Sequence, residues 1–363
     1  MLLLISENEC CIQHWSPKIS FVTAADGTRI AVAEIGNGPT ILKTGNWLSH
    51  VGQDEENPIW RHWLNELSLH HRLIRYDLRG CGLSDRDVED VSFDAWLSDL
   101  EAVADTIEGP VTLLGLSQGC ALSIAFAHRH PEKVKRLVLL GAYAQGMLAR
   151  GENTNARLEA DTLANLIQLG WGKDLPAFNQ VFTHLFVPSG TPEQHVWWRR
   201  LERESTSPET AQRILEVLHK IDISEDAKNL KVPTLIFHAK NDARIPFDEG
   251  RKLATAIENA QFVALDSSNH ILLENEPAWE VFRSTFRMFM PETDTRQSIH
   301  TDYQLTKAEG EVIALVAKGM ANPEIASILG KSEKTVRNQI TVALDKVGVR
   351  SRSELIVKLL SDR

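Results

Sequence analysis

A serine between two glycines is the residue of this chain that most directly predicts covalent chemistry. Ser117 lies in the segment Gly115-Leu116-Ser117-Gln118-Gly119, after the apolar run Val111–Leu114 and before a helix-like stretch. A serine on such a strand-to-helix turn is held in a strained conformation that exposes its hydroxyl, and small residues two positions away avoid clashes. The five-residue pattern alone occurs by chance, but the strand and helix around it make it specific.

A serine acts as a nucleophile only beside a base and an acid that orients that base. Asp242 follows the strand-like run Thr234–His238, and His270 follows the run Gln261–Leu265. Loops that leave strand ends carry the sites of open α/β sheets, so we expect this acid and this histidine to meet the serine as a triad. Asp266 is a rival acid, but it lies too near the histidine in the chain for the usual arrangement.

The elements that must position these residues follow from the alternation of apolar runs and helical stretches. This alternation is typical of a mostly parallel sheet flanked by helices, an α/β fold. The expected strands are Arg29–Glu34, Thr40–Lys43, Arg72–Tyr76, Val111–Gly115, Val134–Leu140, Thr234–His238 and Gln261–Leu265. Residues 145–225 break the rhythm, and their helical sequence predicts a cap inserted between two strands of a domain spanning 1–290.

These motifs, together with Asp77-Leu78-Arg79-Gly80-Cys81-Gly82-Leu83-Ser84-Asp85, resemble the α/β-hydrolase superfamily across about residues 20–290. The resemblance implies the α/β-hydrolase fold with a helical cap. It also implies that Ser117 is the nucleophile, His270 the general base and then acid, and Asp242 the carboxylate that fixes the imidazole.

Two backbone amides are expected to form an oxyanion hole. One is that of Gln118, directly after the nucleophile, and the other belongs to Asn46 or Trp47 in the loop after the strand Thr40–Lys43. The superfamily often has His-Gly in that loop, whereas this chain has Thr44-Gly45. A backbone donor needs no particular side chain, so the substitution leaves the donor in place.

The last sixty residues predict a separate bundle of four short helices. Thr306 with Glu309 forms a capping box, and an N-cap asparagine with proline after it, Asn322-Pro323, opens the second helix. Gly330 ends that helix and Ser332 caps the third. A second capping box, Ser351 with Glu354, opens a last helix with the apolar residues Leu355, Ile356, Leu359 and Leu360. Two short helices joined by a tight turn are the signature of a helix-turn-helix.

The helix after that turn is the one that enters the major groove of DNA. Its outward face and the residue before it supply the candidate contacts Lys331, Lys334, Thr335, Arg337, Asn338 and Thr341. The segments Asn322-Pro323-Glu324-Ile325-Ala326 and Ser332-Glu333-Lys334-Thr335-Val336-Arg337-Asn338 resemble the LuxR-type helix-turn-helix family over about 305–360. The resemblance implies a homodimer that binds paired half-sites through its last helix.

Charge separates the two parts of the chain. Residues 301–363 hold ten lysines and arginines against eight aspartates and glutamates, while the remainder holds 29 against 41. The acidic balance of the larger part argues against nucleic acid binding there. We expect a cytoplasmic protein without a membrane segment, a linker at 291–304 and a DNA-binding domain at 305–363. The four cysteines, Cys10, Cys11, Cys81 and Cys120, suggest neither disulfides nor a metal site, and no cofactor is expected.

The fusion of the two motifs predicts a transcriptional regulator. Its N-terminal domain would sense a small, partly apolar ester- or lactone-like ligand, and hydrolysis of that ligand is left open. The alternative is an active serine esterase, of the carboxylic ester hydrolase type, whose C-terminal helices serve dimerisation or protein docking. A third reading is a binding-only sensor that keeps an idle triad.

Overall fold

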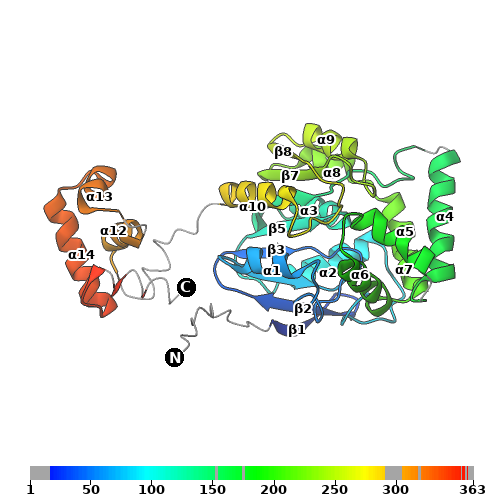
Figure 1. Ribbon diagram of the computed structural model, residues 1–363, viewed down its shortest axis with the longest axis horizontal. Helices are drawn as coiled ribbons and strands as arrows, with labels where there is room; N and C mark the ends of the chain where they lie inside the picture. The colour runs from blue at the N-terminus through cyan, green and yellow to red at the C-terminus, as the bar shows by residue number, and fades with distance from the viewer. Residues whose placement is uncertain are drawn as a thin grey trace, which may run out of the picture. The chain divides into compact units, whose positions relative to one another are not determined.

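An eight-stranded sheet forms the frame of the N-terminal unit of the computed structural model (Figure 1). Its order is β1-β2-β4-β3-β5-β6-β7-β8, antiparallel between β1, β2 and β4 and parallel elsewhere. The strands are β1 (Lys18–Thr23), β2 (Arg29–Ile35), β3 (Thr40–Lys43), β4 (Arg72–Tyr76), β5 (Val111–Leu116), β6 (Val134–Leu140), β7 (Thr234–Ala239) and β8 (Ala260–Leu265). Both β5 and β7 are buried at every position, so the two strands that lead to the serine and the acid lie in the core.

The structure describes residues 17–151, 154–173, 176–290, 305–317, 320–352, 354–355 and 358. The chain divides into two compact units, 1–286 and 287–363, and each is described by itself. The expected linker at 291–304 and the cysteines Cys10 and Cys11 lie outside the described residues. No helix in the described part of the chain is both long and apolar enough to span a membrane.

The seven expected strands are present within one or two residues of their expected bounds, but β1 was not expected. Lys18-Ile19-Ser20-Phe21 alternates polar and apolar residues, a weak strand signal that the sequence interpretation passed over, and five of the six residues of β1 are exposed. It pairs with β2 from Lys18 opposite Glu34 to Thr23 opposite Arg29. Backbone pairing at the sheet edge, rather than burial of side chains, therefore determines this strand.

Helices cover the sheet in two groups. The pair α1 (Arg61–Ser68) and α10 (Pro277–Phe289) packs through Trp63 and Trp279, whose ring centroids are 4.7 Å apart. The second group contains α2 (Phe93–Ala104), α3 (Gln118–Arg129), α8 (Ser224–Asn229) and α9 (Phe247–Ala256), and a short 3₁₀ helix, η1 (Pro131–Lys133), leads into β6. Because α3 begins directly after β5, the serine turn is fixed between a buried strand and a buried helix.

The cap is the insertion between β6 and β7. It consists of α4 (Thr154–Gly170), α5 (Pro176–Phe186), α6 (Pro192–Ser205) and α7 (Pro208–Lys220), drawn in green in Figure 1. A β-bridge between Gln145 and Asp222 closes the base of the insertion, and the side-chain amide of Gln145 donates to Asp222 at 2.9 Å. The cap therefore leaves and re-enters the sheet domain at one clamped point.

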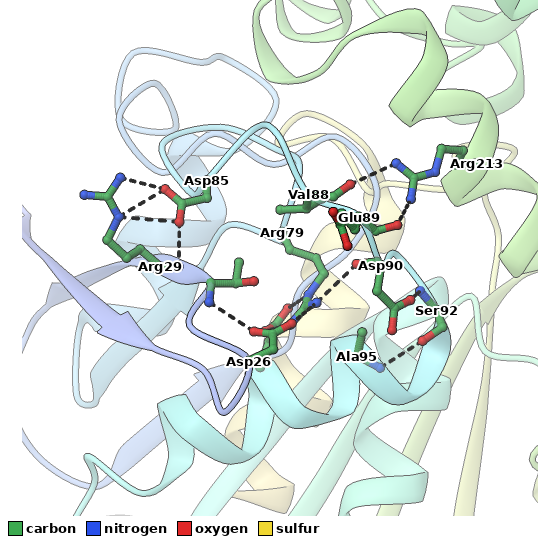
Figure 2. A network of polar contacts seen from close by, with 12 residues as sticks. Asp26, Arg29, Arg79, Asp85, Val88, Glu89, Asp90, Ser92, Ala95 and Arg213 are labelled. Atoms are coloured by element: carbon green, nitrogen blue, oxygen red, sulfur yellow. Dashed lines mark hydrogen bonds and ion pairs between the residues drawn. The ribbon is translucent and has the colours of Figure 1, made fainter.

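The loop after β4 is held by a buried arginine. The guanidinium of Arg79 forms a two-pronged pair with the carboxylate of Asp99 on α2, at 2.9 and 2.7 Å, and contacts Asp26 at 2.7 Å. Figure 2 shows Arg79 beside Asp26, together with the bond from Arg79 to the backbone carbonyl of Asp90, which measures 3.1 Å. The side chains of Arg79 and Asp99 are 1% and 0% exposed, so each charge depends on the other.

The same loop is bonded to the cap. Arg213 on α7 donates to the carbonyls of Val88, at 3.0 Å, and Glu89 (Figure 2). The amide of Gly82 donates to the carbonyl of Ser205, the last residue of α6, at 2.8 Å. Two cap helices are therefore anchored to a loop whose own position is determined by a buried ion pair.

Removing one partner of this pair leaves the other buried without compensation. We expect Asp99→Asn to lower the free energy of unfolding of the N-terminal unit by about 3–5 kcal/mol. Urea unfolding followed by tryptophan fluorescence measures this unit alone, because all nine tryptophans precede residue 290. The control is Arg29→Gln, which breaks the exposed pair with Asp85 and is expected to leave stability nearly unchanged. Equal losses in both variants would contradict this account.

The C-terminal unit contains α12 (Lys307–Ala317), α13 (Asn322–Leu329) and α14 (Glu333–Val347). Their apolar faces share one core with members from all three helices and from beyond α14, namely Val312, Ile313, Val316, Ile325, Val336, Ile340, Ala343, Val347 and Leu355. Gly330 ends α13 in the left-handed conformation, with φ of 61°, and Ser332 caps α14 by accepting from the amide of Thr335 at 3.1 Å. This is the expected pair of helices with a tight turn.

One expected cap is shifted. The second helix is capped at Ala321, whose amide donates to the Glu324 carboxylate at 2.7 Å, so Asn322 is already inside the helix. The side chain of Asn322 accepts instead from Arg352 at 2.9 Å. This tertiary bond replaces the local capping bond that its sequence position predicts. Of the expected last helix, Ile356, Leu359 and Leu360 lie outside the described residues.

Candidate active site and nucleic-acid interface

The backbone of Ser117 is held in a conformation that few non-glycine residues adopt. Its φ is 53° and its ψ is −120°, at the junction of β5 and α3. A Cβ at Gly119 would lie 2.7 Å from the Oγ1 of Thr44, and one at Gly115 would lie 2.7 Å from the Cα of Cys120. Gly115 is therefore required by the close approach of the helix backbone and Gly119 by that of the buried Thr44 side chain, and the motif predicts small residues at both positions.

The structure brings His270 and Asp242 together. The Nδ1 of His270 lies 2.7 Å from the Oδ2 of Asp242. The other carboxylate oxygen accepts from the amides of Arg244 and Ile245, at 2.9 and 3.0 Å. Burial alone would raise the pKa of Asp242, but the attraction and hydrogen bond of His270 and the bond from Ile245 lower it below its ordinary value. Asp242 therefore stays ionised and can fix the orientation of the imidazole.

The remaining nitrogen of the imidazole faces the serine pocket. Among the described residues, the buried Nε2 of His270 has no hydrogen-bond partner, and His270 and Ser117 line the same pocket. A base with an open nitrogen beside a serine hydroxyl can accept its proton. The rival acid, Asp266, is 87% exposed and lies beside Lys240 at 3.9 Å, away from the imidazole.

The pocket is narrow and mostly apolar. It contains about 460 Å³ of space between atoms, open solvent at its mouth included. Its lining combines residues of the serine turn, the acid and histidine loops and the cap, namely Asn46, Trp47, Leu116, Ser117, Tyr143, Phe186, Leu218, Arg244, Ile245, His270 and Ile271.

The two expected loop donors of the oxyanion hole differ in availability. The amide of Trp47 donates to the side-chain Oε1 of Gln118 at 3.0 Å, so this expected donor is engaged. In the described part of the chain, the amides of Asn46 and Gln118 have no hydrogen-bond partner. Lys43 donates to the side chain of Asn46, whose amide group donates to the carbonyl of Trp47 at 3.0 Å, and both bonds hold the loop. Asn46 and Gln118 are therefore the amide pair available to an oxyanion.

The cap holds the backbone of the histidine loop. The amide of His270 donates to the carbonyl of Phe186, the last residue of α5, at 2.8 Å. The amide of Ser189 donates to the side chain of Asn269 at 3.0 Å, and the hydroxyls of Ser189 and Ser268 lie 3.1 Å apart. The position of the base is therefore linked to the position of the cap.

Aromatic rings separate the pocket from the outer face of the cap. Trp47 stacks on Trp171 at 6.0 Å, and Phe186 stacks on Trp198 at 4.7 Å. The indole of Trp198 donates to the buried carboxyl of Glu202 at 2.8 Å. Trp198 thus lies behind the pocket wall, and burial raises the pKa of Glu202 to about 8.

Glu202 makes the stability of the cap depend on pH. Its folded pKa of about 8 lies above the ordinary glutamate value of 4.5, so between these two pH values the folded protein keeps a proton that the unfolded chain loses. The contribution of Glu202 to the free energy of unfolding is therefore expected to fall as pH rises from about 5 to about 8.

Urea unfolding at several pH values checks this expectation. Glu202→Gln, which stays neutral, should flatten that part of the profile, while Glu193→Gln on the exposed first turn of α6 should leave it unchanged. A wild-type profile that rises with pH and is unaltered by Glu202→Gln would refute it.

The recognition face of α14 is exposed. Lys334, Thr335, Arg337, Asn338 and Thr341 all lie on its solvent side, whereas Val336 and Ile340 face the core. Among these five, the hydroxyl of Thr335 lies 2.8 Å from that of Ser332, and that of Thr341 bonds to the carbonyl of Arg337 at 3.1 Å. In the described residues, no hydrogen bond or ion pair engages the side chains of Lys334, Arg337 and Asn338.

Lys331 differs from the other expected contacts. It is partly buried, its amine donates to Gln339 at 3.2 Å, and it lies 4.0 Å from the carboxylate of Glu311. To contact DNA, the amine of Lys331 has to leave Gln339 and Glu311, and the loss of these two interactions weakens any such contact.

Seven of the eleven described residues that line the pocket were not identified from the sequence, among them Tyr143, Phe186 and Arg244. Tyr143 follows β6, Phe186 ends α5, and Arg244 lies two residues after the acid Asp242. For Arg244 the sequence does hold a signal, because a basic residue two positions after the candidate acid lies in a loop expected to border the site. The positions of Tyr143 and Phe186 depend on where the cap folds back, and no local pattern encodes that.

Family models match both parts of the chain. Residues 55–277 match the alpha/beta hydrolase fold family, and residues 303–359 match the bacterial regulatory proteins of the luxR family. The chain therefore belongs to the alpha/beta hydrolase fold family and carries a C-terminal LuxR-type DNA-binding domain. The fusion expected from the two motifs is confirmed.

Relatives and solved structures agree with this assignment. The AB hydrolase superfamily protein YisY of Bacillus subtilis is 29% identical over 256 residues, covering 69% of this chain and 91% of that protein. The 2-hydroxy-6-oxo-2,4-heptadienoate hydrolase of Pseudomonas putida is 28% identical, covering 70% and 90%. The esterase EaEST of Exiguobacterium antarcticum superposes with a TM-score of 0.64 at 25% identity, covering 74% of this chain and 98% of its own. Each of these three similarities covers about seven tenths of this chain.

Proposed function

We propose that this protein is a transcriptional regulator whose hydrolase domain binds and hydrolyses a small, partly apolar ester or lactone. Ser117, His270 and Asp242 act as the triad. The observation that carries the proposal is the 2.7 Å contact between His270 and Asp242, with the open Nε2 of His270 in the pocket of Ser117. Occupation or turnover of this site alters how the DNA-binding modules of a homodimer engage paired half-sites.

The proposed reaction has two balanced halves. The Oγ of Ser117 attacks the ligand carbonyl as His270 takes the hydroxyl proton, and the amides of Asn46 and Gln118 donate to the oxyanion. The C–O bond to the leaving alcohol then breaks, and His270 returns the proton to that alcohol. A water molecule next attacks the acyl-serine in the same way, which releases the acid and restores Ser117.

DNA recognition is proposed to come from α14. Its exposed Arg337 and Asn338 have the donor patterns that pair with guanine and adenine edges in the major groove. The C-terminal part has a small positive charge. Specific contacts from α14 therefore matter more for affinity than a general electrostatic field.

A fluorophosphonate probe tests the triad. We expect intact-mass analysis to find one adduct on the wild-type protein and none on Ser117→Ala, because only an activated serine reacts. Cys120→Ser, at a buried residue of the same turn, is the control that keeps the nucleophile. A folded wild-type protein without an adduct would favour the binding-only sensor over a hydrolytic one.

Substitutions at Arg337 test the DNA-reading role. On duplexes selected from a random pool by the full-length protein, Arg337→Ala is expected to weaken binding by about 1–3 kcal/mol. Arg337→Lys keeps the charge but loses the planar fork, so it should relax base preference while retaining the salt dependence. If the full-length protein selects no sequence, the alternative of an esterase with a dimerising or docking tail is favoured.

A further inference from the structure

Arg244 is a charged residue of the serine pocket that the proposed triad chemistry does not use. It is partly buried and lines the pocket beside Tyr143 and the base. In the described part of the chain, its guanidinium makes no hydrogen bond or ion pair, and the hydroxyl of Tyr143 has no hydrogen bond either. Other buried guanidiniums are paired, as Arg75 is with Asp54 at 2.9 Å and Arg79 is with Asp99.

The charges around Arg244 do not replace a direct partner. Burial lowers its pKa, while Tyr143, Asp242 and Glu159 oppose that shift. Asp242 uses one oxygen for His270 and the other for backbone amides, and Glu159 is an exposed residue of α4. Arg150, which adds a further positive charge nearby, is itself paired with Glu249 at 3.2 Å. In the described part of the chain, the guanidinium of Arg244 therefore has no direct protein partner at the pocket wall.

We propose that the ligand of this pocket carries a carboxylate, which Arg244 and the hydroxyl of Tyr143 bind while its ester carbonyl lies at Ser117. This inference rests on the proposed function and specifies its substrate class. A guanidinium is planar and matches the two oxygens of a carboxylate. Leu218, Ile271 and Phe186 supply apolar walls, which suit a short hydrocarbon chain between the two ends of the ligand.

A carboxylate is favoured over a phosphate by the pocket itself. One guanidinium and one hydroxyl provide few donors, and the space is narrow. A phosphate dianion would bring more charge and more acceptor oxygens into the apolar walls than these two groups satisfy.

The first experiment compares two esters of equal chain length on the full-length protein. Mono-(4-nitrophenyl) glutarate ends in a carboxylate and 4-nitrophenyl valerate ends in a methyl group. For each protein, kcat/KM for the anionic ester is divided by kcat/KM for the neutral ester, after the rate in buffer alone has been subtracted. We expect this ratio to be at least about tenfold lower in Arg244→Gln than in wild type. Arg244→Lys should recover part of it. Arg129→Gln, the same charge change at an exposed residue of α3, should keep the wild-type ratio.

A second experiment does not depend on turnover. Thermal unfolding followed by tryptophan fluorescence is measured with glutarate, valerate and propyl phosphate. We expect glutarate to raise Tm most in wild type and Arg129→Gln, and to lose that advantage in Arg244→Gln. Stabilisation by glutarate without cleavage of either ester would support the carboxylate site while contradicting hydrolysis.

Three results would overturn the inference. The first is that both esters are used equally and glutarate gives no preferential stabilisation. The second is that Arg244→Gln keeps the preference for a carboxylate. The third is that propyl phosphate stabilises the protein more than glutarate does. The first of these, if accompanied by ester cleavage, would leave the proposed hydrolase function intact.

Discussion

The positive φ of Ser117 is the constraint on which the candidate site depends. A non-glycine residue in this region is strained by about 1–3 kcal/mol and persists only where the surroundings hold it. Here the amide of Ser117 donates to the carbonyl of Leu140 on the adjacent strand at 2.9 Å, and α3 begins at the next residue. The same tight approach brings Thr44 against Gly119, which places the oxyanion loop beside the nucleophile. The strained turn at Ser117, the start of α3 and the loop that contains Thr44 thus pack against one another.

The sequence predicted features that have local signals. The serine turn, the acid and histidine after their strands, and the capping boxes each depend on residues close in the chain. The structure places His270 against Asp242 and in the same pocket as Ser117. Features created by distant packing were missed. The edge strand β1 buries almost no apolar surface, and the amide of Trp47 is taken by Gln118, a residue 71 positions later. Asn322 exchanges its expected capping role for a bond with Arg352 from another part of the fold.

The two units differ in where they place their charged and polar side chains. The hydrolase unit buries charge in defined pairs, such as Arg79 with Asp99, and these pairs fix loops that no strand holds. The DNA-binding unit has a small apolar core and leaves its polar face on α14 open. Its stability and its recognition therefore reside on opposite faces of one helix, so contact residues can change without disturbing Val336 and Ile340. The hydrolase unit has no such separation, because its pocket wall is also its core.

The bond from the amide of His270 to the carbonyl of Phe186 limits how this protein can evolve. Caps are insertions, and an insertion can drift in length and sequence when nothing else depends on it. Here the end of α5 also supports the backbone of His270, so a deletion or a rotated helix there would move this imidazole as well as the pocket wall. Lineages that acquire new ligands through this cap must alter it in ways that keep one carbonyl in place. We therefore expect substitutions to accumulate at the outward side chains of α4 and α6, while the backbone conformation at Phe186 stays unchanged.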